Sequence, residues 1–262
     1  MHGLGHIDEG REIDWGRVSA DYAAYRPGPP LSFYDRMKEC GIGLPDQKIL
    51  DLGTGTGVLA RQFARQGAMP VGTDISEGQI AVAAGLAEHE KLKADFFVSP
   101  SESLPFGDGL FDVVTANQCF LYFDRSKTIP EIRRVLKPGG LFSTSHICWL
   151  PLEDEIAART EELILKFNPQ WSAAGYTGEI PAVPEWSKKD FGLVDSFYYD
   201  APVRFTRERW RGRIKVCRAI GAALPEKEVE LFDKALEKLL ADIAAPEFDV
   251  LHRIDAHVFE FK

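Results

Sequence analysis

The sequence predicts an α/β fold built on a doubly wound, mostly parallel sheet, and three observations support this prediction. Short apolar runs that end in polar residues alternate with segments of helical spacing between residues 48 and 147. One of these runs breaks into glycines at alternate positions. The 262 residues suffice for one sizeable core, and a composition of 45% hydrophobic and 27% charged residues is that of a globular protein.

The most informative element is segment 48–57, with the sequence Lys-Ile-Leu-Asp-Leu-Gly-Thr-Gly-Thr-Gly. It predicts a strand and a tight glycine turn, and residues 58–64 continue with helical spacing. Glycine lets a ligand lie against bare backbone, and the N–H groups at the start of the helix face that ligand. A P-loop would need Gly-Lys-Ser/Thr, and a dinucleotide site would need Gly-x-Gly-x-x-Gly, so neither motif fits.

Residues 51–57, Asp-Leu-Gly-Thr-Gly-Thr-Gly, resemble motif I of the class I S-adenosylmethionine (SAM)-dependent methyltransferases. Glu-x-Leu-Pro-Phe at 102–106, Phe-Asp-Val-Val at 111–114 and Leu-Lys-Pro-Gly-Gly at 136–140 resemble the type 11 group of that family. The resemblance covers residues 48–147 densely. It implies a Rossmann-like sheet of seven strands with strand 7 antiparallel, SAM as cofactor and S-adenosylhomocysteine as product.

The resemblance and the strand ends together predict a set of cofactor-binding residues. They are Tyr25, Arg26, Asp51, Gly53, Thr54, Gly55, Gly57, Asp74, Ile75, Ser101, Glu102, Asn117 and Gln118. Asp74 ends the second apolar run, where a carboxylate can accept bonds from both ribose hydroxyls, and Ile75 would then touch adenine. The alternative for Asp74 is a cap on the helix predicted over 77–89.

Two parts of this predicted site depart from the family pattern or leave alternatives open. Where many members carry an Asp that meets the adenine amino group, this chain has Pro100, so the contact would pass to the Ser101 hydroxyl or to backbone at 101–102. Tyr-x-x-Tyr-Arg-Pro-Gly at 22–28 resembles a stretch that folds over the cofactor. The aromatic face of a Tyr suits the sulfonium of SAM, and an Arg suits its carboxylate. The alternative is that the Tyr side chains pack on the core and the Arg side chain lies in solvent.

The chain is predicted to form one methyltransferase domain over residues 1–262. Residues 1–45 would form an N-terminal helical cap and 46–147 the SAM-binding core. Substrate-side helical insertions would cover 148–190 and 204–245. No metal site is expected, because the four cysteines stand far apart with no Cys-x-x-Cys pair.

Several side chains are candidates for the acceptor side. His146, at the predicted end of the fifth strand, is the candidate catalytic general base, with a structural histidine as the alternative. Arg204, Arg207 and Arg211 belong to a basic segment with a helix predicted over 206–221, and their spacing suits a carboxylate or phosphate. A solvated helix face is the alternative for these arginines.

The expected function is methyl transfer from SAM to a small-molecule acceptor, with O-, N- and C-methylation left open. A net charge of −9 argues against nucleic acid as the main partner. The apolar runs fall short of the ~18 residues of a membrane span, and the first residues do not resemble a secretory signal, so a cytoplasmic location is expected. A homodimer stays open. The alternatives are a SAM-binding protein without transferase activity, an RNA methyltransferase and a nicotinamide-dependent oxidoreductase.

Overall fold

The computed structural model describes residues 7–8 and 19–262 and divides the chain into two compact units. The first unit contains the described residues of 1–27, with 147–179 and 199–253. The second unit contains 28–146, 180–198 and 254–262. Part of the predicted N-terminal cap (1–45) therefore lies outside the described residues.

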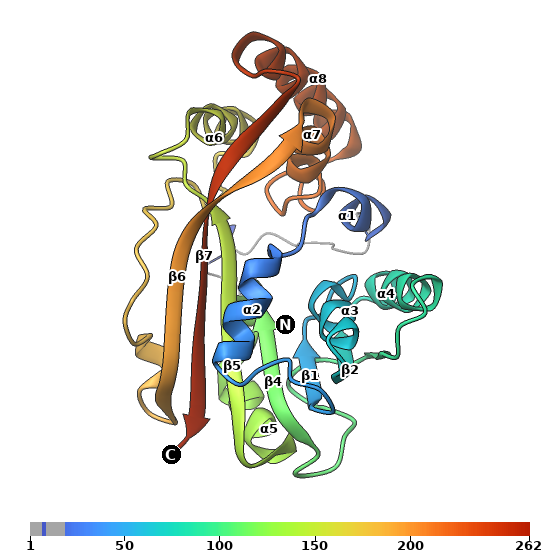
Figure 1. Cartoon of the computed structure of the whole chain (residues 1–262). Coiled ribbons are helices and arrows are strands. Elements are labelled where there is room, and N and C mark those ends of the chain that lie inside the picture. Colours follow the sequence, from blue (N-terminus) through green and yellow to red (C-terminus); the bar gives the residue numbers. More distant parts are fainter. Residues whose placement is uncertain (1–6, 9–18) are drawn as a thin grey trace. The chain divides into compact units, whose positions relative to one another are not determined.

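Seven strands form one sheet in the order β3-β2-β1-β4-β5-β7-β6 (Figure 1). They are β1 (Lys48–Leu52), β2 (Met69–Asp74), β3 (Asp95–Val98), β4 (Phe111–Asn117), β5 (Leu136–Trp149), β6 (Phe191–Thr206) and β7 (Glu247–Phe261). Strands β1 to β5 pair in parallel, and β7 is antiparallel. The predicted fold class is confirmed.

Eight α-helices and two 3₁₀ helices connect the strands in the described chain. They are α1 (Ser19–Tyr25), α2 (Leu31–Glu39), α3 (Val58–Arg65), α4 (Glu77–His89), η3 (Phe120–Tyr122), α5 (Arg125–Val135), α6 (Glu155–Phe167), η4 (Glu185–Ser187), α7 (Arg207–Lys215) and α8 (Glu226–Ile243). Ser76 caps α4 by accepting from the Gln79 N–H.

Two element boundaries differ from the prediction. β5 continues to Trp149, so His146 lies inside the strand rather than at its end. β6 runs to Thr206 with Pro202 inside it, which an edge strand tolerates because one side needs no ladder bonds. α7 ends at Lys215 rather than near 221, and the Gly221 N–H donates back to the Lys215 carbonyl.

The core of the second unit lies where α5 packs on the central strands. Ile132 of α5, Leu50 of β1, Val114 of β4 and Phe142 of β5 have no measurable exposure. Burial of each such side chain contributes about 1.5–3 kcal/mol. This packing holds the carboxyl ends of β1 and β4 in fixed register, with Leu52 opposite Ala116.

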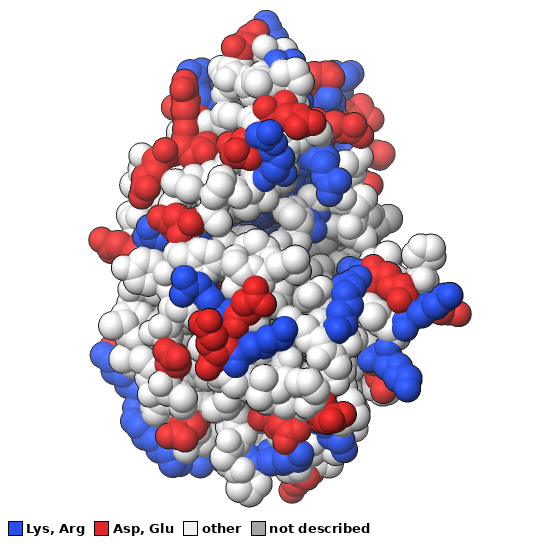
Figure 2. All heavy atoms as spheres, viewed as in Figure 1, with Lys and Arg blue, Asp and Glu red and all other residues white. Residues whose placement is uncertain are grey.

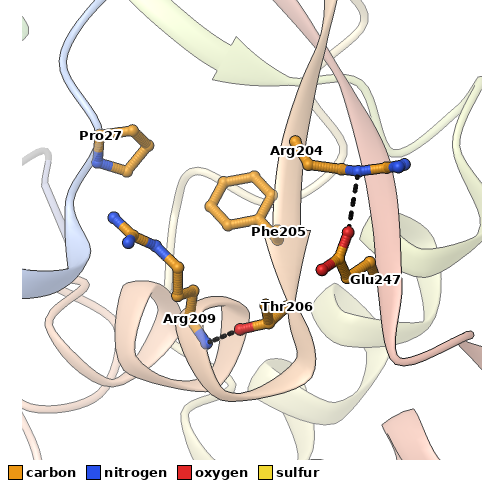
Figure 3. A pocket seen from close by; sticks show the side chains of 6 residues that line it. All are labelled: Pro27, Arg204, Phe205, Thr206, Arg209 and Glu247. Carbon is orange, nitrogen blue, oxygen red and sulfur yellow. Dashed lines mark hydrogen bonds and ion pairs between the residues drawn. The ribbon is translucent and has the colours of Figure 1, made fainter.

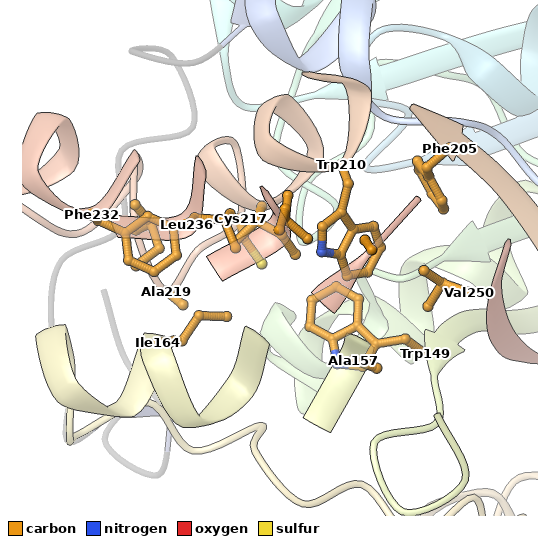
Figure 4. Packing of buried hydrophobic residues seen from close by; sticks show 14 of the residues in the cluster. Trp149, Ala157, Ile164, Phe205, Trp210, Cys217, Ala219, Phe232, Leu236 and Val250 are labelled. Atoms are coloured by element: carbon orange, nitrogen blue, oxygen red, sulfur yellow. The ribbon is translucent and has the colours of Figure 1, made fainter. Parts of the chain in front are cut away.

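The first unit has its own aromatic core, drawn in Figure 4. Trp149 and Trp210 meet edge to face with ring centroids 5.7 Å apart. The Trp149 indole N–H donates to Glu161 Oε1 at 2.7 Å, and the Trp210 indole N–H donates to Thr160 Oγ1 at 3.1 Å. This core therefore buries both indole rings and gives each indole N–H a hydrogen-bond acceptor.

The surface mixes both signs of charge. On the face shown in Figure 2, Lys and Arg side chains are interspersed with Asp and Glu. A nucleic-acid backbone instead favours a continuous basic stripe. Among the described helices, none is long and apolar enough to cross a membrane.

Candidate cofactor site and general base

The turn after β1 requires glycine at three positions. Gly53, Gly55 and Gly57 have φ values of 57°, 55° and 73°, in the left-handed region that favours glycine. Space is also limited, because a Cβ on Gly53 would lie 2.9 Å from Cys119 Sγ and one on Gly57 would lie 2.8 Å from the Phe96 ring. The turn thus leaves bare backbone at the start of α3, whose N-cap residue offers no side-chain cap.

Asp74 joins this turn to the end of β2. Its Oδ2 accepts from the Gly55 N–H at 3.0 Å, and its Oδ1 accepts from the Ser76 N–H at 3.0 Å. Burial raises the pKa of Asp74, and the backbone donors oppose that rise. Each carboxylate oxygen keeps a further lone pair, so the group can still accept from hydroxyls beside the glycine turn.

Asp51 holds the same turn from inside the fold. It is 2% exposed, and its two carboxylate oxygens accept from Thr54 Oγ1 at 2.6 Å and Thr115 Oγ1 at 2.7 Å. Burial raises its pKa to about 6, with the threonine bonds opposing this and the Asp74 charge adding to it. The structure favours a positioning role for Asp51 and Thr54 over direct contact with a ligand.

The predicted adenine-side residues follow β2 and β3. Ile75 is 70% exposed, so its side chain is available to an apolar ring. The Ser101 hydroxyl is buried and lies 3.1 Å from Thr128 Oγ1 of α5. Glu102 Oε1 accepts from the Asp124 N–H at 3.0 Å. Both side chains thus brace the start of α5, which favours the backbone alternative for an adenine contact.

Asn117 and Gln118 end β4, beside β5. Asn117 Nδ2 donates to Ser145 Oγ at 2.8 Å, and the Gln118 N–H donates to the Ser145 carbonyl at 2.9 Å. Gln118 has a φ of 62°, a left-handed conformation uncommon for a residue other than glycine. This turn places polar groups at the carboxyl edge of the parallel strands, where open α/β sheets bind ligands.

His146 follows Ser145 and forms a pair with Asp255. Its Nδ1 lies 3.1 Å from Asp255 Oδ2, and the Asp255 side chain is 2% exposed while that of His146 is 37% exposed. An ionised carboxylate only accepts, so Nδ1 carries the proton and Nε2 presents a lone pair. Sequence reasoning missed Asp255, although an acid inside the apolar run 254–259 was a signal.

Tyr25 and Arg26 belong to the first unit. A Cβ on Gly212 of α7 would lie 2.2 Å from the Tyr25 ring, so α1 and α7 pack closely there. The Arg26 guanidinium carbon lies 4.9 Å from the centroid of the Tyr22 ring. The remaining predicted residues, from Asp51 to His146, all belong to the second unit.

The three arginines predicted to suit an anionic acceptor already have partners within the chain, which favours the alternative over an anion site. Arg204 lies 3.4 Å from Asp249, Arg207 donates to the Ala244 carbonyl, and Arg211 lies 2.7 Å from Asp233. A guanidinium with a carboxylate partner is a poor anion receptor because its charge is compensated.

One pocket of the first unit lies beside the start of α7. It is lined by Pro27, Arg204, Phe205, Thr206, Arg209 and Glu247 (Figure 3). Thr206 caps α7 by accepting from the Arg209 N–H at 3.1 Å, and Figure 3 shows the Arg209 guanidinium pointing toward Pro27. Among the residues that the structure describes, no group of three His, Cys, Asp or Glu could hold a metal ion.

Comparisons with known proteins agree with this geometry. A methyltransferase domain family matches residues 50–144. Demethylmenaquinone methyltransferase from Thermus thermophilus is 38% identical over 116 residues, which are 43% of this chain and 53% of that protein. The chain spans about half the length of the first curated relatives that it matches.

Solved structures show the same fold. YjhP from E. coli has a TM-score of 0.58 at 18% identity, over 95% of this chain and 99% of that one. A SAM-dependent methyltransferase from Geobacter sulfurreducens, solved with S-adenosylhomocysteine, has a TM-score of 0.54 at 18% identity, over 96% and 99%.

Proposed function

We propose that this chain, whose residues 50–144 form a methyltransferase domain of the class I SAM-dependent family, transfers a methyl group from SAM to a small-molecule acceptor. The observation that carries the proposal is the junction of Asp74 with the glycine turn. A carboxylate that accepts from the Gly55 N–H stands beside a turn of three glycines with positive φ. Such a junction suits a ligand with a vicinal diol next to a polar tail.

The residues around the glycine turn offer a partner for each part of SAM. Asp74 supplies acceptors for ribose hydroxyls, and Ile75 supplies an exposed apolar face for adenine. Asn117 and Gln118 supply polar groups at the sheet edge for the methionine part. When bound, SAM supplies a methyl group already activated by the sulfonium, so the protein's work is alignment and exclusion of water.

We assign His146 as the general base and Asp255 as the residue that positions it. Asp255 fixes Nδ1–H of the imidazole, so Nε2 is the atom that takes the proton from a hydroxyl, amine or acidic carbon of the acceptor. The resulting imidazolium is stabilised by the buried Asp255 carboxylate. This arrangement is the base-and-orienter part of a catalytic triad, without a protein nucleophile.

The net charge of the chain and its similarity to a curated relative both support a small-molecule acceptor. The net charge of −9 and the mixed surface of Figure 2 disfavour an RNA backbone. The curated relative from Thermus thermophilus is named for demethylmenaquinone, a small molecule. The residues that choose among acceptors lie outside the matched segment 50–144, so the methylated atom stays open.

The test is methyl transfer from SAM labelled on its methyl group, scored over a panel of small phenols, amines, carboxylates and quinols. We expect labelled product from at least one class and at least tenfold less with His146→Ala. A chain that binds SAM and labels no acceptor would support a binding protein instead. Transfer to RNA with a strong salt dependence would replace the small-molecule assignment.

A further inference from the structure

Arg213 of α7 is a buried cation without a carboxylate partner in the part of the chain that the structure describes. Its side chain is 94% buried, and its Nη1 has no hydrogen-bond partner among the described residues. The guanidinium carbon lies 5.2 Å from the centroid of the Trp149 ring, so the guanidinium rests on an aromatic surface rather than on an acid. Desolvation lowers the pKa of Arg213, and the Arg26 charge acts in the same direction. A side-chain hydrogen bond with Cys217 and the nearby Tyr22 oppose this shift.

A second guanidinium stands near the first. Arg26 follows α1 directly, and α1 packs on α7 where the Tyr25 ring fits against Gly212. No ion pair within residues 7–8 and 19–262 includes Arg26 or Arg213. Two like charges near each other in a partly buried place raise the energy of the ligand-free protein, which an anion between them would lower.

His252 is a third buried group near the two arginines. It is 2% exposed, and burial lowers its pKa to about 4, with the charges of Arg213 and Arg26 adding to that effect. The neutral ring donates from Nδ1 to the Val250 carbonyl at 2.8 Å. His252 therefore adds no charge of its own, and it leaves Nε2 as a hydrogen-bond acceptor.

Other arginines of the same unit are compensated. Arg218 is also buried, yet its Nε lies 3.2 Å from Asp8 Oδ2. Arg211 lies 2.7 Å from Asp233 on α8, and Arg253 lies 2.6 Å from Asp200 on β6. The fold thus supplies acids to these three arginines. Arg213 is buried as Arg218 is, yet no ion pair among the described residues includes it.

The pocket of Figure 3 is lined by chain neighbours of this arginine pair, Pro27 and Arg209. Arg209 lines it, and Arg213 lies four residues further along α7, on the same helix face. Helical side chains tilt toward the N-terminus, so Arg213 reaches back in the direction of Arg209. Pro27 lines the same pocket and is the neighbour of Arg26 in sequence.

We infer that Arg213 and Arg26 form a binding site in the first unit for a small organic anion, held through a carboxylate or phosphate group. The planar fork of Arg213 suits two parallel N–H···O bonds to such a group. Trp149 below the guanidinium and Phe205 in the pocket wall favour a ligand with an apolar part. The inference does not depend on the proposed function, since it concerns anion binding by first-unit residues.

The test compares Arg213→Met with wild type and with Arg211→Met. Arg211 lies on the same helix, and Arg211→Met makes the same change of charge. It differs from Arg213 because it is paired with Asp233 and Glu237. Binding of benzoate and of inorganic phosphate is followed by calorimetry and thermal unfolding at constant ionic strength. We expect one or both probes to bind wild type and Arg211→Met, with affinity about 10- to 100-fold lower in Arg213→Met. Benzoate alone would indicate a carboxylate ligand, and phosphate alone a phosphate ester.

The ligand-free proteins provide a second readout. Met retains the apolar stem and removes an unpaired buried charge, so Arg213→Met should raise the Tm by about 2–6 °C. A structural arginine would instead lower the Tm when replaced. The inference is overturned if neither probe binds wild type, or if Arg213→Met binds both probes as wild type does. It is also overturned if the variant loses only SAM affinity, because the anion would then be the cofactor's own carboxylate.

Discussion

Replacement of Asp51 by Asn should change how stability depends on pH. Asp51 lies under the glycine turn, and burial raises its pKa from 3.8 to about 6. The folded chain therefore binds this proton more tightly than the unfolded chain does between pH 4 and pH 6. Since stability falls with pH wherever the folded state binds more protons, the contribution of Asp51 is full below pH 4 and is lost as pH rises through 6.

The size of the effect follows from the two pKa values. At 1.36 kcal/mol for each pH unit between 3.8 and about 6, the ionised form destabilises the folded state by about 3 kcal/mol at neutral pH. About 2 kcal/mol of this change falls between pH 4.5 and pH 7.5. Asn has the same shape and does not titrate, so the variant loses this slope. It still offers one acceptor and one donor to Thr54 and Thr115.

The assay is urea unfolding of both proteins at several pH values between 4.5 and 7.5. The free energy of unfolding of wild type relative to Asp51→Asn should fall by about 2 kcal/mol over that range. Asp112→Asn is the control, because hydrogen bonds from Lys137 and Lys48 outweigh partial burial and lower the pKa of Asp112 below 3.8. This carboxyl is ionised in both states throughout the range, so the difference between wild type and Asp112→Asn should stay constant with pH. A difference between wild type and Asp51→Asn that stays constant with pH would refute the reasoning.

The remaining predictions concern the turn and the histidine. Gly57→Ala should destabilise the fold by about 1–3 kcal/mol, because its φ is 73° and the new Cβ would meet the Phe96 ring; urea unfolding measures this, and an unchanged midpoint would count against it. Gly55→Val should abolish SAM binding while circular dichroism stays native, and retained affinity would rule out close backbone approach. Asp255→Asn should lower kcat about 10- to 1,000-fold with SAM affinity intact, and full activity would exclude a positioning role.

The fold of residues 48–147 could be predicted because its signals are local. The glycine turn after β1 and the Leu-Lys-Pro-Gly-Gly segment at 136–140 are each read from neighbouring residues. The later strands were harder. β6 contains Pro202, and the position of β6 at the sheet edge makes that proline acceptable.

The site was predictable to a similar degree. The glycine turn and Asp74 are close in sequence, so their junction could be expected. Asp255 is 109 residues from His146, and no local pattern pairs them. Arg213 belongs to a helix with arginines on several sides, and only the packing of α1 and Trp149 shows which one is buried.

The central claim is that the glycine turn and Asp74 bind SAM. Calorimetric titration of wild type and Asp74→Ala with SAM, and of wild type with NAD, tests it most directly. We predict one SAM site with a Kd on the order of 1–100 μM, weaker by about 1–3 kcal/mol in Asp74→Ala, and no heat of binding with NAD. Equal SAM affinity in the two proteins, or binding of NAD in place of SAM, would contradict the account.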